Sequence, residues 1–383
     1  MKLIHISDLH IGRRLGEYSL AEDQRAILDE ILALIRTEEP DALLIAGDIY
    51  DKTVPPAEAV GLLDDFLTAA VSLTRVMLIA GNHDSPERVA FGGRLMAGAG
   101  LYVCGIYDGE VHRVTLHDSH GEVNVYLLPY LRSADVRRVL PDADTETVDA
   151  AVGSAIDALG VDPAVRNVLL AHQFVVGAER SESEGLSVGT ADSVGADRFS
   201  VFDYTALGHL HRAQNCTAAQ GAVIRYSGSP LPYSVSEAED EKSATVVTME
   251  EKGNVSVRVL PLRPHRRICR LRGTYDEVMA REFYRDTDYT ESYVQITLTD
   301  EYDIPDALYR LRTVYPYLLR LEYDNARTHT ELLPDAVTEG EAMEPGTLFA
   351  SFYETQNGVS MDDDMQAYMD TLIAQIFGEE DAT

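Results

Sequence analysis

Cysteine and long apolar runs are scarce in this chain of 383 residues. Its three cysteines, Cys104, Cys216 and Cys269, are odd in number and widely separated, which excludes a disulfide framework and a thiolate zinc site. No apolar run reaches the roughly 18 residues that a membrane-spanning helix needs. The first residues, "MKLIHISDLH", also lack the apolar core of a signal peptide. We therefore expect a cytoplasmic protein with no membrane partner.

Positive charge is scarce as well. The chain has 32 lysine and arginine residues against 64 aspartate and glutamate residues, so its formal net charge is -32 at pH 7. Such a surface repels polyanions, and any contact with nucleic acid must come from local basic patches, metal ions or a partner subunit. The apolar and charged fractions, 45% and 25%, are ordinary for a globular protein. The chain length favours two or three domains.

Three short apolar runs near the start of the chain are each followed at once by polar residues. Residues 3–7, 43–46 and 76–80 precede "SDLH", "GDIYD" and "GNHD". Such runs are typical of buried strands in a mixed or parallel sheet. Helices are predicted between them, the first one capped by Ser19 with Glu22 three residues later. This alternation predicts an α/β fold with its polar segments at one edge of a sheet.

The rest of the chain continues this pattern and then changes character. A hairpin is predicted around "HDSHG", with further strands over residues 165–173, 204–211 and 222–229, and residues 178–200 are expected to form one long loop. From Arg263 onward a small second α/β domain is predicted, with Thr274 and Glu277 as a capping box. A polar linker over residues 330–347 should lead to a last helix whose apolar face spans Met361 to Phe377.

Five predicted strand ends carry side chains that can bind a metal. They are Asp8 and His10, Asp48, Asn82 with His83 and Asp84, His172, and His209 with His211. Because residues i and i+2 of an extended segment face the same way, Asp8 with His10 and His209 with His211 can each turn two ligands toward one point. Imidazole and carboxylate groups together suit manganese, iron or zinc. Six or seven ligand groups are too many for one tetrahedral zinc, so we expect two ions that share a bridging carboxylate.

Each of these motifs also has an ordinary explanation when it is taken alone. A single D-x-H or GD pattern is common by chance, and His172 by itself would be read as a hydrogen-bonded core histidine. "GNHD" and "GHLH" are more specific, since a glycine turn that presents these side chains has little value for packing. The complete ordered set at strand ends argues against independent accidents.

The ordered series of D-x-H, GD, GNHD, H and GHxH resembles the calcineurin-like binuclear metallophosphoesterase superfamily. Within it, "HISDLHIG", "GNHDSPERV", "LLPY", "SESEG", "ALGHLH" and "YSGSPLPYSVSEAEDEKS" are similar to the SbcD family of nuclease subunits from bacterial SbcCD complexes. The resemblance implies an α/β sandwich of two mixed sheets flanked by helices, with a small α/β capping domain and a C-terminal helical segment. Residues 1–265 would form the nuclease domain, 266–330 the capping and DNA-contact domain, and 331–383 a linker and helix that dock an ATPase.

The resemblance also implies a role for each candidate side chain. One manganese ion would be held by Asp8, His10 and His211, the second by Asn82, His172 and His209, and Asp48 would bridge the two ions. His83 would act as the catalytic acid or hydrogen-bond donor, with Asp84 as its orienting partner. Some members carry a second histidine shortly after the bridging aspartate. This chain has Ile49, Tyr50 and Asp51 there, and we expect Asp51 to be an exposed turn carboxylate.

DNA and a coiled-coil ATPase of the SbcC kind are the partners that the resemblance implies. The chain would act as a homodimer within a heterotetramer, as a 3'-5' exonuclease on duplex ends and an endonuclease on single strands, in repair, recombination and hairpin processing. The candidate DNA contacts are Arg132, Arg137 and Arg138, and a cluster of Arg263, Arg266, Arg267, Arg270 and Arg272. The cluster could equally pair with the carboxylates of the protein itself.

Three alternatives stay open at this point. The apolar face from Met361 to Phe377 could pack on the capping domain of its own chain instead of an ATPase. The same metal site could serve a phosphoesterase for small substrates such as cyclic nucleotides or phosphomonoesters. The chain could also be a DNA-tethering subunit without catalytic activity, although the presence of every expected ligand counts against this.

Overall fold

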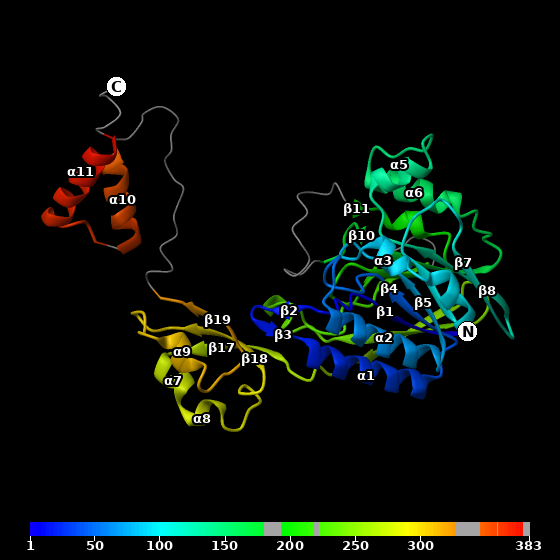
Figure 1. Ribbon diagram of the computed structural model, residues 1–383, viewed down its shortest axis with the longest axis horizontal. Helices are drawn as coiled ribbons and strands as arrows, with labels where there is room; N and C mark the ends of the chain where they lie inside the picture. The colour runs from blue at the N-terminus through cyan, green and yellow to red at the C-terminus, as the bar shows by residue number, and fades with distance from the viewer. Residues whose placement is uncertain (180–192, 218–221, 326–344, 358, 378–383) are drawn as a thin grey trace. The chain divides into compact units, whose positions relative to one another are not determined.

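The computed structural model describes residues 1–179, 193–217, 222–325, 345–357 and 359–377 (Figure 1). The chain divides into two compact units, Met1–Cys269 and Arg270–Thr383. Within the described residues, no helix is long and apolar enough to cross a membrane.

The first unit is built on two six-stranded sheets. The first sheet has the order β16 (Val255–Pro261), β15 (Ser243–Met249), β1 (Lys2–Ile6), β4 (Ala42–Ala46), β5 (Arg75–Ile79) and β6 (Leu101–Cys104). The second has the order β13 (Gln214–Cys216), β14 (Val223–Tyr226), β12 (Tyr204–Gly208), β9 (Arg166–His172), β8 (Gly121–Leu128) and β7 (Arg113–Asp118). Both sheets are mixed, since β1 pairs parallel with β4 and antiparallel with β15, and β8 pairs parallel with β9 and antiparallel with β7. The strands expected from the apolar runs are confirmed.

The two sheets bury a common core. Leu44 and Met77 of the first sheet belong to one buried cluster with Leu127 and Leu170 of the second. Alternate residues of the second sheet, such as Leu169, face away from this core and pack with a helix. Strands covered on both faces have to be apolar on both faces, which explains their continuous apolar runs.

Helices cover the outer faces of the sandwich. In Figure 1, α1 (Ala21–Glu38) and α2 (Ala57–Val71) run side by side along the first sheet. The other helices of this unit are α3 (Pro86–Ala90), α4 (Gly93–Met96), α5 (Ser133–Val139) and α6 (Val148–Ala158). The expected cap of α1 was wrong: Leu20 is the capping residue and no side chain caps the helix, because Ser19 lies one residue too early, in the short strand β3 (Tyr18–Ser19) that pairs with β2 (Arg14–Leu15).

The long loop expected over residues 178–200 falls largely outside the described residues, since 180–192 are not among them. Its described end is more ordered than expected. It contains the short strand β11 (Ser193–Val194), which pairs with β10 (Phe174–Val175), and a 3-10 turn over Ala196–Phe199. The short length of these elements leaves no periodic pattern in the sequence.

The second unit contains the expected small α/β domain. Its three strands are ordered β17 (Ile268–Gly273), β18 (Tyr293–Leu298) and β19 (Leu318–Tyr323), accompanied by α7 (Tyr275–Met279), α8 (Arg281–Tyr284) and α9 (Ala307–Leu311). The predicted capping box of Thr274 and Glu277 is confirmed at the start of α7.

The end of the chain has two helices instead of the one expected. These are α10 (Pro345–Asn357) and α11 (Asp363–Phe377). The linker expected over residues 330–347 was therefore wrong at its end, because α10 begins at Pro345, while residues 330–344 lie outside the described part. Proline at the first position of a helix is favourable, but the polar residues before it indicated a linker.

Candidate metal centre

The ligand candidates sit on strained backbone at the carboxyl ends of the strands. Asp8, His10, Asp48 and His209 have φ angles of 54°, 41°, 49° and 104°. Left-handed conformations of this kind cost roughly 1–3 kcal/mol each and persist where the surroundings hold them. Asp8 and His10 were expected to converge because an extended segment turns alternate residues one way. Instead, left-handed turns aim these side chains into the site.

One group of ligand atoms comes from Asp8, His10 and His211. These atoms all lie within 4.8 Å of one another, and all three residues are buried. The Nε2 atoms of His10 and His211 are 3.1 Å apart. Two imidazole nitrogens and a carboxylate that converge in a buried space are a suitable ligand set for a divalent cation.

Asp48 lies between this group and a second one. Its Oδ2 is 3.5 Å from the Nε2 of His10 and 3.5 Å from the Nε2 of His172. Beyond His172, the Oδ1 of Asn82 lies 3.0 Å from the His172 Nε2 and 3.0 Å from the His209 Nδ1. Asp48 therefore reaches both groups, as a bridging carboxylate must.

In two of the candidate ligand rings, the Nδ1 atom, which is not turned toward the metal site, contacts another group of the protein. His172 donates from Nδ1 to the carbonyl of Ala46 at 2.8 Å, and the Nδ1 of His211 lies 3.4 Å from Oε1 of Glu237. Such contacts fix the ring and leave Nε2 as the ligand atom. Glu237 is fully buried and also accepts a hydrogen bond from Lys242 at 2.5 Å.

Glu237 was missed by the sequence reading. It lies within "SVSEAEDEKS", a stretch with several other acidic residues. Nothing in that stretch marks one carboxylate as buried, since the fold alone brings Glu237 to His211, 26 positions away.

Burial and neighbouring charges shift the pKa values of the groups in the site. Burial raises the pKa of the Asp8 carboxyl to about 6. Burial opposes protonation of His172, yet the neighbouring Asp48 carboxylate outweighs it and raises the His172 pKa to about 9. Burial also opposes the charge on Asp48, but the neighbouring His172 holds its pKa well below the usual range. Bound cations would satisfy these buried carboxylates and keep the imidazoles neutral.

His83 lies beside the ligands and is oriented by two hydrogen bonds. Its backbone N–H donates to Oδ1 of Asp48 at 2.9 Å, and its Nδ1 donates to the carbonyl of Asp51 at 3.0 Å. The His83 ring packs edge to face on His10, with 4.8 Å between the ring centroids. This arrangement leaves the Nε2 of His83 as the ring atom available for chemistry.

The side chain of Asp84 binds backbone groups of two neighbouring loops. Its carboxylate accepts hydrogen bonds from the backbone N–H groups of Ile49, Tyr50 and Gly81 at 2.9–3.0 Å. Burial raises the pKa of this carboxyl to about 7, and the Asp48 charge adds to the shift. Asp84 therefore joins the two loops that carry Asp48 and His83.

Asp51 is not the exposed turn carboxylate that we expected. Its side chain is 11% exposed and accepts a hydrogen bond from Arg13 at 2.8 Å. The expectation failed because a turn residue was assumed to face water, whereas Arg13 covers this one. Its carbonyl group binds His83, and its Oδ1 lies 3.9 Å from the Nδ1 of His10.

The arginines expected to contact DNA have different surroundings. Arg266 forms ion pairs with Asp23 and Glu22, and Arg272 pairs with Asp324. For these two members of the cluster, pairing with the carboxylates of the protein itself is therefore what the structure shows. After "LLPY", Arg137 donates to the carbonyl of Thr145, and Arg132 pairs with Asp135.

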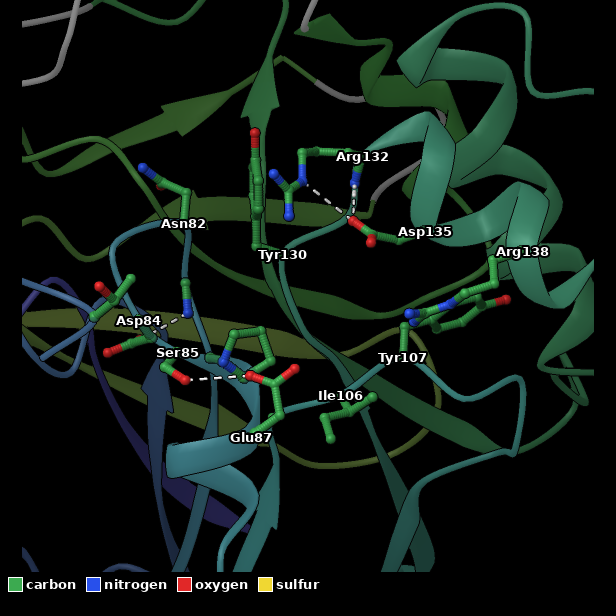
Figure 2. Close-up of a pocket in the computed structure, with 15 residues that line it drawn as sticks. Asn82, Asp84, Ser85, Glu87, Ile106, Tyr107, Tyr130, Arg132, Asp135 and Arg138 are labelled. Atoms are coloured by element: carbon green, nitrogen blue, oxygen red, sulfur yellow. Dashed lines mark hydrogen bonds and ion pairs between the residues drawn. The ribbon is translucent and has the colours of Figure 1, made fainter.

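A cavity of about 670 Å³ adjoins the metal centre (Figure 2). Asn82 and Asp84 line it on the side of the centre, and Tyr130 and Arg132 line it further on. Tyr130 also stacks on the candidate ligand His209, with ring centroids 6.5 Å apart and planes inclined by 15°. The centre and the cavity thus share one wall.

Comparisons with known proteins identify the family of this chain. Residues 1–213 match the model of the calcineurin-like phosphoesterase family, and residues 264–357 match that of the type 5 capsule protein repressor C-terminal domain. The D subunit of the nuclease SbcCD from Staphylococcus saprophyticus is 30% identical over 94% of both chains. The protein of the same name from Staphylococcus epidermidis is 29% identical over 92% of this chain and 93% of that one.

Among solved structures, a dimetal phosphatase from Danio rerio covers 69% of this chain and 99% of its own, with 12% identity and a TM-score of 0.41. The family model covers more than half of the chain, and the relative from Staphylococcus saprophyticus is 30% identical over nearly its whole length. The chain belongs to the calcineurin-like phosphoesterase family and, within it, to the SbcD family of nuclease subunits.

Proposed function

We propose that this chain is the nuclease subunit of an ATP-driven complex and hydrolyses DNA phosphodiester bonds with two manganese ions. The observation that carries the proposal is the convergence of Asp8, His10, His172 and His211 on the buried Asp48. The name that the two Staphylococcus relatives share, that of a nuclease, supports DNA as the substrate.

In this proposal the two metal sites share Asp48. Asp8, His10 and His211 would hold one ion, and Asn82, His172 and His209 would hold the other. A donor set of imidazole and oxygen ligands without thiolate suits manganese, iron or zinc. Among these, the resemblance to the SbcD family favours manganese. When bound, the ions would supply a water of lowered pKa and positive charge for the non-bridging phosphate oxygens.

His83 is the proposed catalytic acid. A cationic ring can donate from Nε2 to the departing sugar oxygen while its Nδ1–H stays on the Asp51 carbonyl. Asp84 is the proposed positioning residue, since it joins the loops that carry Asp48 and His83. Neither residue is needed as a metal ligand.

We propose the following organisation of the chain and its complex. Residues 1–265 form the nuclease domain, 266–330 the capping and DNA-contact domain, and 331–383 the part that docks a coiled-coil ATPase of the SbcC kind. The exposed Phe352, Met365 and Tyr368 of α10 and α11 support such a docking surface. Phe91 and Leu95, which are 81% and 86% exposed, support a homodimer interface. We propose that this homodimer is part of a heterotetramer and that the complex works in the cytoplasm.

The experiment that tests this function measures manganese-dependent hydrolysis of linear duplex DNA, single-stranded DNA and bis-p-nitrophenyl phosphate. The purified chain is assayed alone and with the ATPase partner, beside His83→Ala. The His83→Ala variant should lose about 10²–10⁴-fold in rate and still bind manganese. His117→Ala, which removes an exposed histidine on β7, serves as the matched control and should retain the rate.

The substrates separate the competing functions. DNA cleavage that needs manganese and His83, and that rises with ATP and the partner, supports the nuclease. Cleavage of the small diester alone, with DNA intact even in the complex, would indicate a small-substrate phosphoesterase. Failure to bind manganese at all would indicate a tethering role without catalysis.

A further inference from the structure

A glutamine lies on the buried face of α1. Gln24 is 2% exposed and precedes Ile27, Leu28 and Ile31, which are buried on the same face. A buried amide lowers stability unless its donor and acceptor groups form hydrogen bonds inside the protein. The partners of Gln24 therefore explain why a polar side chain occupies this position.

Both ends of the Gln24 amide bind one turn of the main chain. Its Nε2 donates to the carbonyl of His10 at 2.7 Å and to that of Leu9 at 3.4 Å. Its Oε1 accepts from the backbone N–H of Gly12 at 2.9 Å. The φ angles in this turn are 41° at His10 and 92° at Gly12. A histidine in the left-handed region is strained and needs surroundings that hold it, and Gln24 provides three such contacts.

The direction of the His10 ring depends on this turn more than the other ligand rings depend on theirs. The Nδ1 atoms of His172 and His211 contact the Ala46 carbonyl and the Glu237 carboxylate. Within the described part of the chain, the buried Nδ1 of His10 has no hydrogen-bond partner. The backbone conformation and the packing of neighbouring rings are left to direct the His10 ring.

A second side chain holds the same turn. The hydroxyl group of Tyr233 donates to the Leu9 carbonyl at 2.5 Å. The Tyr233 ring packs edge to face on His10 and His211, with 5.3 Å and 5.5 Å between the ring centroids. Because Tyr233 is buried, it cannot move away without opening the core. It therefore supports both the backbone of the turn and the ring that the turn carries.

Resting on the two-metal centre proposed above, we propose that Gln24 is a positioning residue for the ion that Asp8, His10 and His211 would hold. It acts through the main chain, since it fixes the left-handed turn that aims His10 into the site. A glutamine that only completed the hydrogen bonds of the core would contribute to stability without favouring one metal site over the other. The role proposed for Gln24 predicts a loss confined to one of the two sites.

The test uses Gln24→Met, which keeps about the same side-chain length and removes the three hydrogen bonds. The full chain is freed of metal with EDTA and titrated calorimetrically with manganese. The wild type should bind two ions, and the variant should lose about tenfold or more in affinity for one of them, as when another supporting partner of a ligand is removed. Electron paramagnetic resonance gives an independent signature. At a manganese concentration where the wild type shows a spin-coupled pair, Gln24→Met should show isolated manganese.

The matched control removes a buried amide that lies away from the ligands. Asn167 is fully buried at the start of β9, and its Nδ2 donates to the carbonyls of Asp162 and Val165 at 2.7 Å and 2.8 Å. Asn167→Leu should lower the stability of the metal-free chain as Gln24→Met does. Its two manganese affinities and its resonance spectrum should remain those of the wild type.

A milder variant keeps the proposal testable if Gln24→Met does not fold. Tyr233→Phe retains the ring that packs on His10 and removes only the hydrogen bond to Leu9. It should weaken the same single ion by about two- to tenfold, the usual effect of one lost hydrogen bond.

The outcomes for Gln24 and for the proposed function are distinguishable. Two ions bound with wild-type affinities in both variants, or an equal loss for both ions, would overturn the role of Gln24. A wild type that binds two manganese ions but leaves DNA intact would refute the nuclease alone. A wild type that binds no manganese would refute both proposals.

Discussion

The buried carboxylate of Glu237 contacts both the candidate ligand His211 and the buried ammonium group of Lys242. Its oxygens lie 3.4 Å from His211 Nδ1 and 2.5 Å from Lys242 Nζ. Glu237→Gln keeps the shape but leaves Lys242 without its counter-charge. We expect manganese affinity to fall about 10–100-fold and the free energy of unfolding to fall by about 3 kcal/mol. Calorimetric titration with manganese and denaturant unfolding measure the two effects.

The control for this prediction is two residues away. Glu239→Gln removes the same charge from an exposed position and should leave both quantities unchanged. Adding Lys242→Met to Glu237→Gln removes the unpaired cation, so it should recover stability but not manganese affinity. Unchanged affinity in Glu237→Gln would show that this carboxylate does not orient His211.

Single residues also show how far a sequence reading of the site can go. Asp8, His10, Asp48 and His209 could be singled out as candidates because each lies within a few residues of the end of a short apolar run. Glu237 reaches the site only through tertiary folding, so no local pattern indicates it. Asp51 illustrates the same limit, since the sequence cannot show that Arg13 covers its side chain.

At the scale of the elements, the segments that follow β4 and β5 approach each other closely, and this approach fixes the position of Asp48. A Cβ atom on Gly81 would lie 2.2 Å from Oδ1 of Asp48 and 2.3 Å from its backbone nitrogen. Gly81→Ala must therefore displace the bridging carboxylate. We expect a loss of about 1–3 kcal/mol in unfolding free energy and at least a tenfold loss of manganese affinity, roughly as when a supporting partner of a ligand is removed.

A glycine of α2 provides the matched control. Gly61 is exposed, and a Cβ atom there would meet nothing within 4 Å. Gly61→Ala should stabilise the protein by up to about 1 kcal/mol, since alanine favours the helix, and should leave manganese binding unchanged. If Gly81→Ala bound manganese as the wild type does, the bridging position of Asp48 would have to be revised.

The two sheets are also joined by a buried arginine. Arg166, at the start of β9, forms an ion pair with Asp118 of β7 and donates to the carbonyl of Glu250, just past β15. Hydrogen bonds from Arg166 hold the pKa of Asp118 below its usual range. Because the folded-state pKa is depressed, this stabilisation is complete above the unfolded pKa of about 4 and is lost as the pH falls below it.

Asp118→Asn tests this junction. The variant should lose about 3 kcal/mol of unfolding free energy at pH 7, because the buried Arg166 and the N-terminal ammonium group of Met1 both lose their carboxylate partner. The difference from the wild type should narrow below about pH 4. Denaturant unfolding between pH 3 and pH 7 measures it, with the exposed Asp142→Asn as the control. A difference that does not change with pH would mean that packing, and not charge, is lost.

The elements themselves were predictable to different degrees. The strands of the sandwich followed from apolar runs such as residues 43–46, because a strand buried on both faces must be apolar throughout. The helix start at Ser19 was wrong, since the Ser-x-x-Glu pattern is short and occurs in other contexts. Helix α10 was missed because its first residues resemble a continuation of the polar linker. In this part of the chain, apolar runs predicted the elements more reliably than the short capping motif at Ser19 did.

At the scale of the whole molecule, the negative charge of the chain makes its stability depend on bound metal ions. A net charge of -32 generates self-repulsion, and the centre adds the buried carboxylates of Asp8 and Asp48. Cations in the centre neutralise charge where repulsion is least screened. Metal binding should therefore be coupled to the stability of the first unit as well as to chemistry.

Removal of metal should accordingly lower the stability of the first unit. Free manganese at 100 times its dissociation constant stabilises a protein by about 2.7 kcal/mol per site, provided that the unfolded chain does not bind it. Thermal unfolding is measured in EDTA and in rising manganese concentrations. The wild type should unfold at a higher temperature as manganese increases, and Asp48→Asn, which lacks the bridging charge, should respond far less. Calcium at the same concentrations controls for screening of the net charge. If calcium or Asp48→Asn gave the same rise, manganese would act on the acidic surface and not through the buried centre.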